Sequence, residues 1–203
     1  MNNKQLNADL VEEIVYLIEL LTKSGFFTKD EIIEILQDQF IEEEIDFTNY
    51  EISLNDFSNE NFAKLEKVFV KLSKEGIVGI HNCGFDIKEG VEDAFELYIH
   101  LINNDFSPEG FCFYTFEDIE EAVFDGKLKI TFGDFENNEN KALEIGNIIF
   151  NYLIEESFSI NWDGTVNNQI EINPFIWDKS FNFDREYEIE GAYECFVKNQ
   201  VFE

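Results

Sequence analysis

Apolar residues in the amino-terminal part of the chain recur at helical spacing, which predicts a helix ending at Gly25. Its apolar stripe comprises Leu10, Ile14, Leu17 and Leu21. Thr28 and Glu31 have the spacing of a capping box, so a second helix is expected to begin there. Its buried face is expected to be Ile32, Ile33, Leu36 and Phe40.

Farther along the chain, helical stripes alternate with short strand-like runs. The expected strands lie at about 77–80, 111–114, 128–132, 158–162 and 169–172. The expected helices lie at about 62–72, 91–102, 115–123 and 142–153. The last two strands flank an Asp-Gly turn and predict a hairpin with a long loop. This order predicts an α+β (mixed α/β) fold, with helices packed on a four- to five-stranded mixed sheet and a helical amino-terminal extension.

Two regions follow from this pattern. We expect a helical amino-terminal region at 1–56 and an α/β core with an acidic carboxy-terminal tail at 57–203, with one continuous domain as the alternative. Within the tail, Tyr193 to Val197 is interpreted as an edge strand or a docking segment.

The net charge of the chain favours some classes of binding partner over others. The chain has 203 residues with 44 acidic and 14 basic side chains, giving a net charge of −30. Such a field disfavours direct binding to nucleic acid or membrane and favours a basic protein. The first sixty residues alone contain fifteen acids and three lysines. The alternative is that the acidity only keeps the protein soluble, and the oligomeric state is left open.

The sequence favours a cytoplasmic location. The amino terminus lacks the apolar core of a signal peptide, and no apolar run is long enough to span a membrane. The three cysteines are widely spaced and odd in number, as expected for reduced thiols.

One loop contains candidate ligand-binding chemistry. His81, Asn82 and Cys83 follow a predicted strand, and Asp86 is nearby. A Cys/His pair would need both side chains on the same side of the backbone. Residues two positions apart meet this condition only where the backbone is extended. A structural turn at the strand end is the favoured interpretation.

No catalytic residue, metal-ligand set or cofactor motif is predicted elsewhere, so the expectation leans away from an enzyme. The candidate partner-binding residues are Glu42, Glu43, Glu44, Trp162, Asp163 and Trp177. Tryptophan can anchor an interface, although core packing at the sheet edge is favoured for both tryptophans.

Several short motifs follow one another along the middle of the chain. They are Gly76-Ile77-Val78, Asn82-Cys83-Gly84, Gly110 to Tyr114 followed by Asp118 and Glu120, Leu128 to Gly133, Ile145-Gly146, and Asn161 to Thr165. Over roughly residues 60–180 the chain thereby resembles a bacterial family of uncharacterised proteins, recorded only as a domain of unknown function. The resemblance implies no catalytic residues, and it leaves out the helical front end and the acidic tail.

The leading hypothesis is a non-enzymatic acidic protein-binding module, such as an immunity-type or antitoxin-like antagonist of a basic partner. One alternative is a small-ligand-binding protein or enzyme with its site near His81 and Cys83. Another is a nucleic-acid mimic whose carboxylates imitate phosphates.

Overall fold

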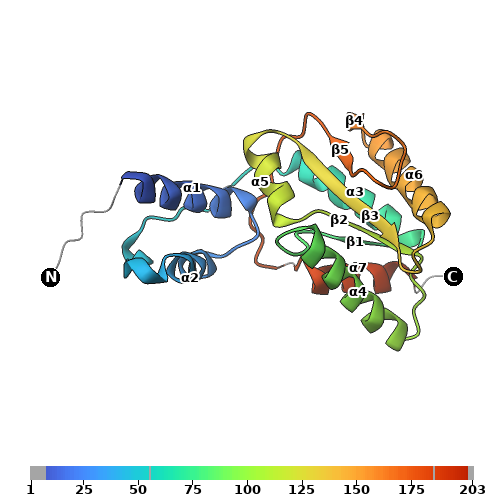
Figure 1. Ribbon diagram of the computed structural model, residues 1–203, viewed down its shortest axis with the longest axis horizontal. Helices are drawn as coiled ribbons and strands as arrows, with labels where there is room; N and C mark the ends of the chain where they lie inside the picture. Colours follow the sequence, from blue (N-terminus) through green and yellow to red (C-terminus); the bar gives the residue numbers. More distant parts are fainter. Residues whose placement is uncertain (1–7, 55, 185, 201–203) are drawn as a thin grey trace. The chain divides into compact units, whose positions relative to one another are not determined.

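The computed structural model describes residues 8–54, 56–184 and 186–200 (Figure 1). Residues 1–7, on which part of the expectation about a signal peptide rests, lie outside these ranges. The described residues form seven α-helices and a five-stranded mixed sheet, which confirms the predicted fold class. They divide into two compact units. The first contains the chain up to Asn59 together with Asp178–Asn182, and the second contains Glu60–Trp177 and the chain from Phe183 onward.

The first unit is helical. It comprises α1 (Ala8–Ser24), α2 (Lys29–Gln39) and the short 3-10 helices η1 (Ile41–Glu43) and η2 (Phe47–Asn49). The predicted capping box of α2 is confirmed, since Thr28 Oγ1 accepts from the Glu31 amide at 3.2 Å and Glu31 Oε2 accepts from the Thr28 amide at 2.7 Å. The core of the unit is built from Ile14, Leu20, Leu21, Ile32, Leu36, Phe40, Phe47 and Ile52.

A late segment of the chain returns to complete this unit. The Ser180 hydroxyl accepts a hydrogen bond from the Phe57 amide at 2.7 Å and donates one to the Phe57 carbonyl at 3.1 Å. The Asn59 amide donates to the carbonyl of Asp178 at 3.1 Å. Residues more than a hundred positions apart are thereby joined at the backbone.

The second unit is built on the sheet, in the order β1-β2-β3-β5-β4. The strands are β1 (Ile77–Ile80), β2 (Gly110–Phe113), β3 (Leu128–Asp134), β4 (Ile160–Asn161) and β5 (Ile170–Ile172). β1 and β2 are parallel, and the other neighbours are antiparallel. The predicted hairpin is confirmed as β4 and β5.

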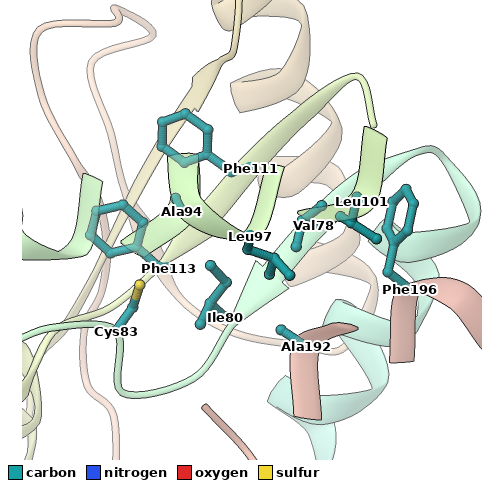
Figure 2. Close-up of a cluster of buried hydrophobic side chains, with 10 residues drawn as sticks. All are labelled: Val78, Ile80, Cys83, Ala94, Leu97, Leu101, Phe111, Phe113, Ala192 and Phe196. Carbon is teal, nitrogen blue, oxygen red and sulfur yellow. The ribbon is translucent and has the colours of Figure 1, made fainter. Parts of the chain in front are cut away.

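Five helices belong to the second unit: α3 (Glu60–Lys74), α4 (Ile87–Asn103), α5 (Phe116–Phe124), α6 (Glu139–Glu155) and α7 (Ile189–Gln200). Because side chains alternate along a strand, one face of β1 and β2 carries Val78, Ile80, Phe111 and Phe113. These pack against residues of α4 and α7 (Figure 2), namely Ala94, Leu97, Leu101, Ala192 and Phe196. The two helices are therefore held by one shared core.

The opposite face of these strands is covered by α3 and α6 at close range. A Cβ at Gly79 would come within 2.7 Å of the Phe69 ring of α3. A Cβ at Gly110 would collide with the Ile145 side chain of α6. Glycine at both positions lets the helices approach the sheet backbone, so helices cover both faces of this part of the sheet.

The interpretation of Tyr193 to Val197 as an edge strand is wrong, because this segment lies within α7. Ala192 and Phe196 are buried and lie four positions apart, which places them on one face of a helix. Aromatic content favoured a strand, but burial with helical spacing decided the structure.

Candidate functional site

A groove of about 600 Å³ lies between α4 and α7. Its lining residues are Glu96, Leu97, Ile99, His100, Asn103, Ile189, Glu190, Tyr193 and Glu194. The two helices meet through Leu97 and Ala192 in the shared core, and the rings of His100 and Tyr193 lie 4.8 Å apart, centroid to centroid. Both helices lie in the second unit, so the groove belongs to one compact body.

The groove combines apolar side chains with carboxylates. Ile99 is 51% exposed. Contact with water does not stabilise an isoleucine side chain, whereas burial of its apolar surface does. Glu96, Glu190 and Glu194 are exposed around it. A surface of this composition matches a segment that has an apolar side and basic side chains next to it.

Sequence reasoning missed this groove, although α4 contained a signal for it. Its apolar residues exceed those needed for one face: Ala94, Leu97 and Leu101 are buried, whereas Phe95, Ile99 and Ile102 are exposed. A helix with apolar residues beyond its core-facing stripe is a candidate for a second contact. The position of α7 beside it required the tertiary structure.

A second, smaller pocket of about 300 Å³ lies at the β4–β5 hairpin. It is lined by Lys129, Asn161, Trp162, Asp163, Asn168, Gln169 and Glu171. Two residues of the predicted partner-binding set, Trp162 and Asp163, therefore lie together at one pocket. Asp163 accepts hydrogen bonds from Asn168 and Thr165, and these bonds lower the pKa of its carboxyl group.

The predicted ligand-binding loop is buried rather than open. The Nδ1 atom of His81 lies 2.7 Å from the Tyr114 hydroxyl, and the His81 ring stacks on Phe69 at 4.4 Å between centroids. Burial raises the pKa of the Tyr114 hydroxyl. The cavity that His81 lines has a volume of about 10 Å³, which is room for about one water molecule.

The other residues of this loop point to separate partners. Asn82 adopts a left-handed backbone with φ 50°, so the chain is not extended between His81 and Cys83. The Cys83 thiol donates to the Gly90 carbonyl at 3.3 Å, and burial raises its pKa far above the usual range. Asp86 caps α4 by accepting from the Glu89 amide at 2.9 Å. The hydrogen bonds of His81, Cys83 and Asp86 therefore go to three different parts of the fold.

The remaining predicted residues lie in different surroundings. Trp177 is buried among aromatic rings, with Phe62 and Tyr114 within 6.0 Å between centroids, so it packs in the core. Glu42 and Glu43 are in η1, and Glu44 follows in a left-handed conformation. Glu42 and Glu44 are exposed on the first unit.

In the described ranges, no set of three or more His, Cys, Asp or Glu side chains is arranged to hold a metal ion. Nor is any helix in the described part of the chain both long and apolar enough to cross a bilayer.

Comparison with known protein families yields a match over most of the chain. The profile of the domain of unknown function DUF6891 matches residues 7–181. The chain belongs to this family. The match confirms the resemblance to a domain of unknown function, and it begins in the amino-terminal helical region, earlier than the expected start near residue 60. No curated protein and no solved structure matches the chain.

Proposed function

We propose that this DUF6891 protein is a non-enzymatic binding module that holds a basic partner protein in the groove between α4 and α7. The supporting observation is the combination, in one groove, of exposed Ile99 with the carboxylates of Glu96, Glu190 and Glu194. The occupant is a basic amphipathic helix of the partner, which places its apolar side on Ile99 and Tyr193. Its lysines and arginines then face the glutamates.

The overall charge assists this binding in a different way. A net charge of −30 attracts a basic protein over distances comparable to the Debye length and accelerates encounter. It does not select a surface, because acids are present all along the chain. The groove supplies the position through apolar contact, and the partner's activity is blocked where its basic surface is covered, as in an immunity or antitoxin protein.

A synthetic probe tests the proposal directly. The probe is a fluorescein-labelled peptide of leucine and lysine arranged as an amphipathic helix, titrated with the full-length protein and followed by fluorescence anisotropy. The comparison peptide has the same composition in an order with no apolar face. We expect the amphipathic peptide to bind more tightly and to shift backbone amide resonances of α4 and α7.

Two charge-matched variants separate the groove from general acidity. Glu190→Gln with Glu194→Gln removes two charges at the groove and is expected to weaken binding roughly fivefold. Glu139→Gln with Glu144→Gln removes two exposed charges on α6 and is expected to leave binding within about twofold. Equal weakening by both variants, or equal affinity for the two peptides, would contradict the proposal.

A further inference from the structure

The pocket at the β4–β5 hairpin is independent of the α4/α7 groove and has a different chemistry. Strand register places Lys129 of β3 opposite Glu171 of β5, and Glu171 opposite Asn161 of β4. The three side chains therefore form one row across three neighbouring strands, on the same face of the sheet. The hairpin loop adds Asp163 and Asn168 at one end of this row.

Trp162 forms part of the wall and is held rigidly. Its Nε1 donates to the Thr165 carbonyl at 3.0 Å, and its ring lies 5.7 Å from Phe132 and 6.0 Å from Phe150, centroid to centroid. A Cβ at Gly146 would lie 3.1 Å from the indole, so α6 packs closely beneath it. A half-buried aromatic ring fixed in this way presents a surface to a ligand at little entropic cost.

Hydrogen bonds between side chains orient the polar atoms of the pocket. Asn168 Nδ2 donates to Asp163 Oδ2 at 2.6 Å, and Asn161 Nδ2 donates to Glu171 Oε1 at 3.4 Å. Each amide nitrogen carries a second hydrogen, and each carboxylate keeps further lone pairs. The pocket therefore offers donors and acceptors side by side.

This mixture discriminates between classes of ligand. An anion would face the carboxylates of Asp163 and Glu171, while the one lysine of the pocket is already within 2.7 Å of Glu121. A cation would use the carboxylates alone and would leave the exposed amide hydrogens of Asn161 and Asn168 to water. A hydroxyl group both donates and accepts, so it satisfies both kinds of neighbour at once.

We propose that this pocket binds a neutral, hydroxyl-rich ligand, with a pyranose ring against Trp162 and its hydroxyls bridging Asn161, Asn168, Asp163 and Glu171. The volume of about 300 Å³ admits one such ring and leaves room for part of a second. The site does not depend on the α4/α7 groove, because no residue lines both.

The test is nuclear magnetic resonance of the full-length protein with defined sugars. The probes are the methyl glycosides of glucose, galactose, mannose and N-acetylglucosamine, with cellobiose and maltose; spermidine and inorganic phosphate are the charged comparators. We expect at least one sugar to produce saturable shifts, with millimolar affinity, at the Trp162 indole N–H and at the amides of residues 161–171.

Glu171→Gln removes one charged acceptor while keeping an acceptor for Asn161, and it is expected to weaken the sugar about tenfold. Glu144→Gln, an exposed change on α6, serves as the control and is expected to leave the affinity unchanged. The proposal is overturned if no sugar gives saturable shifts at these residues. It is also overturned if spermidine or phosphate binds there more tightly than every sugar, or if Glu171→Gln has no larger effect than the control.

Discussion

Lys179 is buried with its ammonium group 2.5 Å from the carbonyl oxygen of Gly25, a residue 154 positions earlier in the chain. The same group lies 3.3 Å from the Ser180 carbonyl and 4.3 Å from the centre of the Phe26 ring. A lysine is rarely buried unless its charge is compensated, and here carbonyl oxygens and a ring face compensate it. Lys179 therefore joins the returning segment to the end of α1.

Lys179→Met tests this link. Methionine fills similar volume but leaves two carbonyl oxygens without their donor, so we expect the first unit to lose about 1–3 kcal/mol of stability. Hydrogen exchange of α1 and α2 amides, read by mass spectrometry, measures the loss. Lys198→Met, at an exposed position in the last turn of α7, is the control and is expected to change stability by less than about 0.5 kcal/mol. Unchanged exchange in α1 would contradict the assignment.

Tyr114→Phe tests the structural role of His81. The change removes the hydroxyl that contacts His81 Nδ1, and we expect a loss of about 1–2 kcal/mol in the free energy of unfolding. Chemical denaturation followed by circular dichroism gives the value. Tyr98→Phe is the matched control, because it also removes one tyrosine hydroxyl and keeps the ring, which stacks on Phe135. A loss no larger than that of the control would show that the contact adds nothing to stability.

The three thiols are expected to differ in reactivity. Burial raises the pKa of the Cys83 and Cys112 thiols far above neutral pH, so both remain protonated and shielded from solvent. Cys195 is only partly buried. With a chromogenic disulfide reagent at neutral pH we expect Cys195 to react first and the other two only in denaturant. Labelling of Cys83 at the same rate as Cys195 would mean that the loop opens.

Glu156 links α3 to α6 in a pH-dependent way. Hydrogen bonds from Lys67 and then Lys71 lower the pKa of its carboxyl group below its usual 4.5. A lowered folded-state pKa stabilises the protein above the unfolded value, and this contribution disappears as the pH falls through the folded value. Glu156→Gln should therefore lower the melting temperature at neutral pH, and this effect should shrink as the pH is lowered below 4.5. Glu144→Gln is the control, and an effect of Glu156→Gln that does not change with pH would contradict the linkage.

Local signals carried most of the fold prediction. The capping box at Thr28 involves residues three positions apart, so the sequence alone displays both partners. The β4–β5 hairpin was equally visible, because its strands alternate around a turn. The segment from Tyr193 to Val197 was wrongly predicted as a strand. The β propensity of aromatic residues depends on their packing, and packing involves residues that are distant in the sequence.

The candidate sites were only partly visible for the same reason. Trp162 and Asp163 are adjacent in sequence and were both predicted as partner-binding residues, whereas Glu171 comes to the same pocket only through strand register. The groove brings together Ile99 of α4 and Tyr193 of α7. The sequence around either residue does not indicate that the other lies beside it. A Cys/His pair at His81 and Cys83 would have required an extended backbone, and the left-handed conformation of Asn82 instead sends their side chains to different partners.

The return of Asp178–Asn182 to the first unit affects how the protein is made. The ribosome synthesises the α1–α2 region first, yet Ser180 must emerge before Phe57 obtains its hydrogen bonds. The second unit is likewise incomplete until α7 supplies Ala192 and Phe196 to the core shared with α4. Domains usually fold one after another during translation, beginning at the amino terminus. Here neither unit is finished when its first helices have been synthesised, because each needs contacts from residues much later in the chain.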